Sequence, residues 1–336
     1  MKKLPIIAIA GATGLIGNEL VVLLEQLHIP YSQVRLFASE ESVGEFYKVR
    51  DDELTVELLT DSSFEGVDLA LFALPEERTK HFIECAIKAG AWVVDTSRYL
   101  SQDTSVPLIV PEVNIDSIDP SKKLAANPCS VSIQLASILK VIQEGAGIKR
   151  VVVSTYQACS SAGKIALDEL WEQTRSVFNM KDIPHEAFQH QIAFNCIPQI
   201  DVMLDNGITR EEKAIIEHTR RVLNLPELSI SATAVRVPVF HSDAVSPNVE
   251  TIREMSPEQF VKAAHVRGGL SISTDHSEFP LQVDVANSDD VHVGRIRADS
   301  SVKYGLNMWV VCDNIRKGAA LNAMQIVKYL IDKFSA

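Results

Sequence analysis

The amino-acid sequence predicts an α/β fold in which a parallel sheet covered by helices is followed by a second domain of α+β type. The chain has 336 residues, more than one ordinary hydrophobic core accommodates, so two domains are expected. Over the first hundred residues, short β-branched runs alternate with amphipathic helical patterns, which is typical of a parallel sheet. Beyond residue 150, longer strand patterns are interleaved with long helices, which indicates the second domain.

The first domain is expected to contain short apolar strands separated by helices. The strands are predicted at residues 6–10, 34–38, 69–73 and 92–95. The first helix is predicted over residues 18–27, and the last helical pattern, residues 318–334, is expected to return to this domain. We therefore assign residues 1–128 and 316–336 to the first domain.

The second domain is expected to comprise residues 129–315. Its long strands are predicted at residues 151–156, 229–239 and 281–285. Neither an internal repeat nor a low-complexity segment interrupts it, so one α+β unit accounts for this part of the chain.

The composition is that of a soluble globular protein and argues against several function classes. Hydrophobic residues make up 46% of the chain and charged residues 23%, and the formal net charge is −12. Because nucleic-acid-binding proteins normally present a basic face, this charge argues against nucleic acid as a partner. No apolar run is long enough to span a membrane, and the start of the chain leads into a strand pattern rather than a signal peptide, so a cytoplasmic protein is expected.

The cysteines indicate reduced thiols rather than disulfides. They are Cys85, Cys129, Cys159, Cys196 and Cys312, an odd number of widely spaced residues that lie mostly inside apolar runs. Neither a CxxC pair nor a His-rich spacing occurs, so no metal site is expected.

A glycine-rich turn, GATGLIG at residues 11–17, follows the first predicted strand and opens the first predicted helix. In this context, a G-x-x-G-x-x-G loop holds a dinucleotide pyrophosphate at a helix N-terminus, because glycines let the backbone approach the phosphates. The candidate cofactor-binding residues here are Gly11, Thr13, Gly14, Leu15, Ile16 and Gly17. The first domain is therefore expected to be a Rossmann-type dinucleotide-binding domain; the alternative is that these glycines serve only a tight turn.

The segment NPCSVSIQ, residues 127–134, places a thiol beside a hydroxyl at the start of a predicted helix. Apolar residues recur at positions 135, 138, 139 and 142, and Gly145 ends the pattern, so the helix begins close to Cys129 and Ser130. Free backbone N–H groups and the positive end of the helix dipole lower the pKa of a thiol from its ordinary value of about 8.5. Cys129 and Ser130 are thus the candidate nucleophiles.

Ordered motifs along nearly the whole chain resemble those of the aspartate-semialdehyde dehydrogenase family. The motifs are GATGLIG at residues 11–17, VPLIVPEVN at 106–114, STYQA at 154–158, Asp201 with Asn206-Gly207, VGRIR at 293–297 and DNIRKGAA at 313–320. The resemblance implies an NAD(P)-dependent oxidation in amino-acid biosynthesis, in which a cysteine attacks the aldehyde, a histidine acts as base and phosphate releases aspartyl phosphate. It also implies that the second domain is a catalytic and dimerisation domain and that the protein is a homodimer.

The nucleophile segment departs from the family pattern, which is N-P-N-C-[ST]-T-I-Q. Alignment without a gap places Ser130 at the position of the family's cysteine and Cys129 one residue earlier. A shift of one residue at a helix start turns a side chain by about 100°, which moves it out of attack geometry. A serine hydroxyl is far less acidic than a thiol and needs an adjacent general base. Cys129 is therefore either a nucleophile positioned by a different loop path or a buried inert thiol.

Four further residues match catalytic or substrate-binding positions of the family. Gln157 resembles the glutamine that orients the substrate, and Glu217 a substrate-binding glutamate. Arg236 resembles the arginine that pairs with the substrate carboxylate, a role suited to a guanidinium. His241 resembles the base, but its interval from Arg236 is two residues shorter than the family's. A solvated helix face would explain Glu217 equally well. In the same way, His241 would be explained as a polar residue at the end of a strand.

Cations are missing from the anion-binding positions. Ser101 aligns with the family's phosphate- and substrate-binding arginine, for which Arg98 is the nearby replacement. Glu41 and Glu45 align with basic residues that hold the 2′-phosphate of NADP, in a segment that begins with Ser39. Because carboxylates repel a phosphate and accept a hydrogen bond from a ribose hydroxyl, NAD is favoured over NADP, unless these glutamates are only solvated surface residues.

Along the expected cofactor path, one segment argues against cofactor binding and one residue argues for it. Pro75 and Glu76 stand where the family has glycines, which narrows the path. Asn314 resembles the residue that contacts the nicotinamide amide, and its neighbourhood is intact.

The combination of a matching framework with an altered nucleophile segment is similar to the Usg-like paralogues of the family. Two hypotheses follow. In the first, the chain is an NAD-dependent oxidoreductase with weak or altered activity on a small semialdehyde, using Cys129. In the second, it is a non-catalytic homodimer that binds a dinucleotide, a metabolite or a protein partner.

Overall fold

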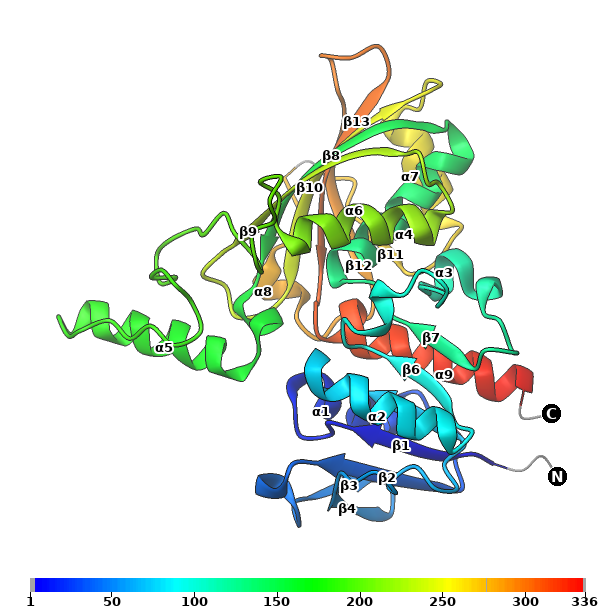
Figure 1. Ribbon diagram of the computed structural model, residues 1–336. Helices are drawn as coiled ribbons and strands as arrows, with labels where there is room; N and C mark the ends of the chain where they lie inside the picture. The colour runs from blue at the N-terminus through cyan, green and yellow to red at the C-terminus, as the bar shows by residue number, and fades with distance from the viewer. Residues whose placement is uncertain (1–3, 276, 335–336) are drawn as a thin grey trace. The chain divides into compact units, whose positions relative to one another are not determined.

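The computed structural model describes residues 4–275 and 277–334, and the chain divides into two compact units. Unit 1 comprises Met1–Pro128 and Ala319–Ala336, and unit 2 comprises Cys129–Gly318. Figure 1 labels the helices and strands of both. Unit 1 therefore contains both ends of the chain.

Unit 1 is built on a predominantly parallel sheet, as predicted. Among its described residues, the strand order is β3-β4-β2-β1-β5-β6-β7, and each neighbouring pair is parallel except β3 with β4. The strands are β1 (Ile6–Ala10), β2 (Gln33–Ala38), β3 (Phe46–Val49), β4 (Asp52–Leu58), β5 (Leu69–Phe72), β6 (Trp92–Asp95) and β7 (Leu124–Ala126). Because β2 and β5 flank β1, the strand order reverses at the carboxyl ends of β1 and β5, where open α/β sheets bind their ligands.

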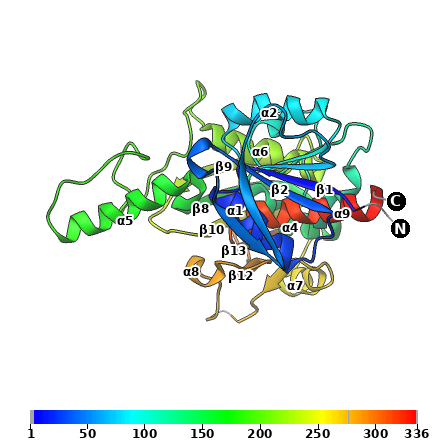
Figure 2. The same ribbon diagram turned by 90° about the horizontal axis from the view of Figure 1, so that it is seen from below.

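Helices cover both faces of this sheet. They are α1 (Leu15–Gln26), α2 (Glu76–Lys88), α3 (Pro111–Asn114) and α9 (Leu321–Phe334), with 3₁₀ turns η1 (Glu40–Ser42), η2 (Leu100–Gln102) and η3 (Ile115–Ser117). Helices α1 and α9 pack together on the face to which Ile7 and Ile9 of β1 point. Phe72 of β5 stacks on Phe64 at the opposite face, and Figure 2 shows α2 on the other side of the strands from α1 and α9.

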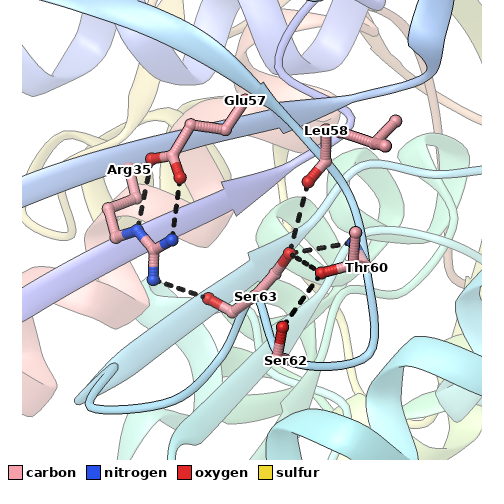
Figure 3. A network of polar contacts seen from close by, with 6 residues as sticks. All are labelled: Arg35, Glu57, Leu58, Thr60, Ser62 and Ser63. Atoms are coloured by element: carbon pink, nitrogen blue, oxygen red, sulfur yellow. Dashed lines mark hydrogen bonds and ion pairs between the residues drawn. The ribbon is translucent and has the colours of Figure 1, made fainter.

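A polar network fixes the connection between β4 and β5 (Figure 3). The guanidinium of Arg35 on β2 donates to both carboxylate oxygens of Glu57 on β4, at 3.2 and 2.8 Å, and to the backbone oxygen of Ser63 at 3.0 Å. The Ser63 hydroxyl accepts from the Thr60 backbone N–H at 2.9 Å. The loop is thereby tied to β2 and β4 by a bidentate ion pair and local turn bonds.

Unit 2 is an α+β structure. Among its described residues, the strand order is β11-β12-β13-β10-β8-β9, with β8/β9 and β11/β12 parallel and the other pairs antiparallel. The strands are β8 (Ile148–Gln157), β9 (Ser229–Arg236), β10 (Asp243–Thr251), β11 (Leu270–Ile272), β12 (Val291–Ala298) and β13 (Gly305–Cys312). The helical segments are α4 (Ser130–Gly145), η4 (Cys159–Ala162), α5 (Lys164–Phe178), α6 (Arg210–Leu223), α7 (Pro257–His265), α8 (Gln282–Val285) and the π-helical turn η5 (Arg316–Ala320), which runs on into α9.

Helix α4 is the buried centre of unit 2. It packs against β8, β10 and β13 on one side and against α6 on the other, and both views show α4 beside α6. Its residues from Val131 to Leu139 are all buried, so the N-terminus of α4 is held rigidly by its own core.

The prediction of a strand at 281–285 is wrong, because this segment forms the short helix α8. Its alternation of apolar and polar residues is too short to separate a strand from one helical turn. Tertiary contacts determine the conformation of this segment: the Gln282 amide donates to the backbone oxygens of Tyr156 and Ser242, at 2.9 and 2.6 Å, and Val285 is buried.

The predicted fold class, a Rossmann-type domain followed by an α+β domain, is confirmed.

Candidate active site

The N-terminus of α4 places the two candidate nucleophiles. Cys129 is the N-cap residue, with extended backbone, and Ser130 is the first residue of the helix. Both are half-buried, whereas Val131 and Ile133 are fully buried and fix the helix register. Gly318 packs against Ser130, since a Cβ at Gly318 would lie 2.7 Å from the Ser130 Cβ. The glycine of the DNIRKGAA motif therefore leaves room for the start of α4.

Ser130 is bound to a buried carboxylate. Its hydroxyl donates to Asp243 Oδ2 at 2.6 Å, a length typical of a charge-assisted bond. Asp243 begins β10, is fully buried, and accepts the backbone N–H of Ala158 on its other oxygen at 2.9 Å. Burial raises the pKa of Asp243 to about 6, against the opposing effect of the bonds from Ser130 and Ala158.

Cys129 has different neighbours. Its backbone N–H donates to Nδ1 of the buried His218 on α6 at 3.1 Å, and its thiol donates to the Ser132 hydroxyl at 3.2 Å. The Ser132 hydroxyl in turn donates to the backbone oxygen of Ile215. The thiol is thus directed along the α4–α6 contact, while Ser130 is directed towards β10.

Gln157 and Arg236 are brought together as neighbouring ends of two parallel strands. They are register partners at the carboxyl ends of β8 and β9, and both are buried. The Gln157 amide donates to Glu211 Oε1 at 3.1 Å, and Glu211 lies in the first turn of α6. The Arg236 guanidinium donates to the Ala158 backbone oxygen at 2.6 Å and to the Ser161 hydroxyl. Its positive charge lowers the pKa of Asp243, whereas the charge of Glu211 raises it.

Two predicted residues are not brought into this cluster. Glu217 is exposed and pairs with Lys213 one turn earlier on α6, at 3.7 Å, as a solvated helix face does. His241 is exposed and lies just before β10. The structure instead places Glu211 beside Gln157, and Asp243 beside Ser130.

Three residues of the cluster were missed by sequence reasoning, namely Glu211, His218 and Asp243. Asp243 lies seven residues after Arg236, which is the interval that the family resemblance requires of the base, so counting the interval would have found it. Glu211 shares the buried face of α6 with Ile215 and Val222, at helical spacing, whereas Glu217 does not. A carboxylate on the apolar face of a helix was therefore the available signal.

Asn314 is buried and bound within unit 2. Its side-chain nitrogen donates to the Ser160 hydroxyl at 3.0 Å, and its oxygen accepts the backbone N–H of Ser242 at 2.9 Å. Asn314 therefore joins η4 to the turn before β10. Ser242 has a left-handed backbone, with φ of 71°, and its buried hydroxyl has no hydrogen-bond partner among the described residues.

The glycine-rich loop of unit 1 has the close backbone approaches expected of a dinucleotide-binding turn. Gly11 has φ of 88°, and a Cβ there would lie 2.4 Å from the Ala73 backbone oxygen. A Cβ at Gly17 would lie 1.9 Å from the Gly11 oxygen. Gly14 is exposed and caps α1, which begins at Leu15 with Ile16 next. Tight packing therefore explains Gly11 and Gly17, while Gly14 faces solvent where a phosphate would approach.

The segment after β2 lies beside this loop. The Ser42 hydroxyl donates to the Thr13 hydroxyl at 3.2 Å, and Ser39 caps η1, which contains the exposed Glu41. Glu45 is also exposed. Acidic side chains therefore lie close to the turn that would hold a dinucleotide.

Arg98 lies in the loop after β6, half-buried, with its backbone oxygen accepting from the Ser101 hydroxyl at 2.9 Å. The loop is anchored by Asp95, whose two oxygens accept the backbone N–H groups of Ser97 and Leu100 at 2.8 and 2.9 Å. Burial raises the pKa of Asp95 to about 6. Ser101, which the sequence motif aligns with the family's arginine, is buried.

One group of ligand types gathers elsewhere in unit 1. Side-chain atoms of Asp61, His81 and Cys85 lie within 4.8 Å of one another. His81 and Cys85 are one turn apart on α2, and His81 Nε2 is 2.7 Å from Asp61 Oδ1. Both partners of that contact are exposed, as in an ordinary surface pair.

Comparison with known proteins defines the class of this chain. Residues 6–121 match a family model described as semialdehyde dehydrogenase, NAD binding domain, and residues 139–317 match one described as semialdehyde dehydrogenase, dimerisation domain. The fold is therefore that of a semialdehyde dehydrogenase.

Individual relatives narrow the class. Aspartate-semialdehyde dehydrogenase of Aquifex aeolicus is 41% identical over 97% of both chains, and aspartate-semialdehyde dehydrogenase 2 of Vibrio cholerae is 38% identical over 97% of both. A crystal structure of Vibrio cholerae aspartate semialdehyde dehydrogenase II complexed with ASA superimposes with a TM-score of 0.96, at 38% identity and 99% coverage of both chains. The chain belongs to the aspartate-semialdehyde dehydrogenase family.

The comparisons confirm the family that the sequence motifs indicated, and with it the NAD(P)-binding domain. In the described part of the chain, no helix combines the length and apolar character that crossing a membrane requires. 

Proposed function

We propose that this chain is a homodimeric, Usg-like paralogue of aspartate-semialdehyde dehydrogenase that binds a nicotinamide dinucleotide and a small carboxylate-bearing metabolite but oxidises aspartate semialdehyde only weakly. The observation that carries the proposal is the bond of 2.6 Å from the Ser130 hydroxyl to Asp243. The family reaction needs a thiolate, which forms readily, and a base that collects its proton. In this chain we assign the position of the thiolate to the Ser130 hydroxyl and the position of the base to the Asp243 carboxylate.

Cys129 does not replace the missing thiol in this proposal. Its thiol donates to Ser132, on the α4–α6 side, and its backbone is held by His218. Attack geometry tolerates little displacement, because most of the advantage of a bound nucleophile comes from its alignment. In this proposal, Cys129 is a packed thiol at the start of α4 and does not act as a nucleophile.

The substrate-recognition groups favour retained binding. Gln157, Glu211 and Arg236 remain as a buried, hydrogen-bonded set that offers one cation for a carboxylate and one anion for an ammonium group. Buried charges of this kind are costly unless they are paired, so their presence supports a site that still binds a small charged ligand.

The cofactor is proposed to be NAD. Glu41 is exposed on η1, which the Ser42–Thr13 bond holds beside the glycine-rich loop. A carboxylate there accepts a hydrogen bond from a ribose hydroxyl and repels a 2′-phosphate. Isothermal titration calorimetry is expected to give tighter binding of NAD than of NADP, with the order reversed or abolished in Glu41→Arg. Tighter binding of NADP by the wild-type protein would contradict the assignment.

The homodimer is supported by exposed aromatic side chains in unit 2. The cytoplasm is proposed as the compartment of the protein. Trp171 and Phe178 on α5 are 55% and 75% exposed, more than isolated surface residues need to be. Reduced cysteines fit the same compartment, since five free thiols are present.

The central test measures reduction of NAD and NADP with aspartate semialdehyde and phosphate. Wild-type turnover is expected to be weak, and the Ser130→Cys/Asp243→His double variant to be at least about 100-fold faster, because it restores a thiol and an imidazole at the paired positions. Ser130→Cys alone separates the contribution of the thiol. Fast wild-type turnover that Cys129→Ala abolishes would refute the proposal and establish Cys129 as the nucleophile.

A further inference from the structure

We propose that Ser130 is an acyl-accepting nucleophile and Asp243 its general base, acting on activated acyl groups, either esters or acyl phosphates, of small dicarboxylic acids. This rests on the proposed function in one respect, namely that the metabolite site of unit 2 opens onto Ser130. The reaction is acyl transfer to water and requires neither a dinucleotide nor a thiol.

The geometry is that of a nucleophile, its base and a group that orients the base. The hydroxyl of Ser130 lies 2.6 Å from Asp243 Oδ2, within the range for proton transfer. The backbone N–H of Ala158 fixes the other carboxylate oxygen at 2.9 Å. Asp243 is fully buried while Ser130 is half-buried, so bulk water does not surround the base, whereas the nucleophile is reachable.

The start of α4 supplies the stabilisation that an acyl-transfer intermediate requires. N–H groups in the first turn of a helix have no intrahelical acceptor, and they carry the positive end of the helix dipole. In α4 these groups begin at Ser130 itself, the side chain of the N-cap residue Cys129 does not cap them, and the first turn contains no acidic residue. An oxyanion formed on a carbon bonded to Ser130 Oγ would lie beside them.

The charges around Asp243 suit a base at neutral pH. Four groups face it: the Ser130 hydroxyl from α4, the Ala158 N–H after β8, Arg236 from β9 and Glu211 from α6. Burial raises its pKa to about 6, so it is ionised yet still able to take a proton near neutrality. Arg236 also provides the cation that a second carboxylate of the acyl group would meet.

The reaction has two balanced halves. In the first, Ser130 Oγ forms a bond to the acyl carbon, its proton passes to Asp243, and the bond to the leaving oxygen breaks with the electron pair leaving on phosphate or on the alcohol. Asp243 then passes that proton to the leaving oxygen and is ionised again. In the second half, water attacks the acyl carbon and gives a proton to Asp243, the bond from the acyl carbon to Ser130 Oγ breaks, and Ser130 Oγ recovers the proton from Asp243. The net change is hydrolysis of the ester or acyl phosphate.

The test uses the full-length protein with three probes: 4-nitrophenyl acetate, mono-4-nitrophenyl succinate and acetyl phosphate. Release of 4-nitrophenolate or phosphate is followed together with intact-protein mass and peptide mapping. The wild-type protein is expected to carry one acyl group on Ser130 and to react faster with the succinyl than with the acetyl ester. Phosphate release distinguishes acyl phosphates from esters as the substrate source.

Three variants decide the roles. Ser130→Ala is expected to lose the adduct, and Asp243→Asn to form it about 100-fold more slowly. Ser137→Ala removes a buried hydroxyl from the same helix that donates to the Ile133 backbone oxygen, and it is expected to react like the wild type. An adduct confined to a cysteine, or equal rates in wild type and Ser130→Ala, would overturn the proposal.

A second measurement uses the wild-type protein alone, so it tests the role of Asp243 even if a variant fails to fold. The rate of Ser130 acylation is expected to rise with pH and level off above an apparent pKa near 6, and a flat profile would contradict the role of Asp243. The dehydrogenase assay contains aspartate semialdehyde and a dinucleotide, and the acylation assay contains neither. Each proposal can therefore fail without the other.

Discussion

At the scale of single residues, the candidate site depends on which side chains the turn before β10 directs inwards. Ser242 is buried with left-handed backbone, so that Asp243 faces inwards and His241 faces solvent. Had the interval from Arg236 been set by a shorter turn, the imidazole would have reached Ser130. The residue type at the base position therefore follows from loop length as much as from sequence identity.

Ser242 is expected to lower the free energy of unfolding of the protein. A non-glycine residue at φ of 71° is strained, and its buried hydroxyl lacks a partner among the described residues. Ser242→Gly is expected to raise the free energy of unfolding by about 1 kcal/mol, measured by urea denaturation. Ser246→Gly in the neighbouring extended strand β10 is the matched control and is expected to lower it by about 0.5–1 kcal/mol. Destabilisation by both substitutions would contradict the strain at Ser242.

Asp243 is expected to make stability depend on pH. Its folded-state pKa of about 6 is higher than the ordinary aspartate value of about 4, so the folded protein binds this proton more tightly than the unfolded chain. The resulting stabilisation is complete below pH about 4 and is lost as the pH rises through about 6. Asp95 acts in the same direction.

Asp243→Asn is therefore expected to reduce the loss of unfolding free energy between pH 4 and 6.5, by about 1–3 kcal/mol. Urea denaturation at four or five pH values measures it. Identical pH dependence in variant and wild type would show that the buried carboxyl is not the titrating group.

The sequence predicts single residues well where a motif has no gap and poorly where a loop intervenes. The position of Ser130 at the start of α4 followed from helix periodicity and alignment, because no insertion separates it from Pro128. Asp243 and Glu211 did not follow, since their roles depend on the length of a turn and on which face of α6 is buried. Such choices are made by tertiary packing rather than by local preference.

At the scale of elements, the glycine-rich turn shows two glycines that packing requires and one that it does not. A Cβ at Gly17 would lie 1.9 Å from the Gly11 oxygen, whereas the nearest contact of a Cβ at Gly14 is 3.5 Å. Gly17→Ala is expected to lower the free energy of unfolding by about 2–3 kcal/mol and to weaken dinucleotide binding, because the turn must open.

Gly14→Ala is the control for this substitution. Gly14 has φ of −76°, which any residue adopts, so alanine there is expected to change stability by only a few tenths of a kcal/mol. Thermal unfolding and calorimetry with NAD measure both variants. Equal stability of Gly17→Ala and wild type would contradict the close approach.

Elements with a strong pattern were predicted correctly, and weak ones were not. Strands β1, β2, β5 and β6 of unit 1 were predicted from uninterrupted apolar runs, because they are largely buried on both faces. Strands β3, β4 and β7 were not predicted, because β3 and β4 expose most of their residues and β7 has only three. Helix α8 was not predicted either, since four residues carry too little periodicity and the bonds of Gln282 to β8 and to the turn before β10 determine its conformation.

At the scale of the whole molecule, the framework shared with the family and the pair formed by Ser130 and Asp243 have different physical requirements. The core of α4 and the sheet of unit 2 depend on burial of apolar side chains, which the family likeness preserves. The chemistry depends on two atoms, a nucleophile and a base, that packing does not specify. The likeness to the family, at a TM-score of 0.96, therefore concerns the framework, whereas the pairing of Ser130 with Asp243 depends on two side chains.

The exposed aromatic face of α5 provides the last prediction. Figure 1 shows α5 extending away from the sheet of unit 2, and Trp171 and Phe178 are seven residues apart, on one side of it. Buried aromatic side chains commonly contribute about 2 kcal/mol or more at an interface, so Phe178→Asp is expected to raise the dimer dissociation constant by about 30-fold or more. Sedimentation velocity over a range of concentrations measures this. Val266→Asp, at an 86% exposed position after α7, is the matched control and should leave the dimer intact. A monomeric wild-type protein, or a Phe178→Asp dimer as tight as the wild type, would rule out this face as the interface.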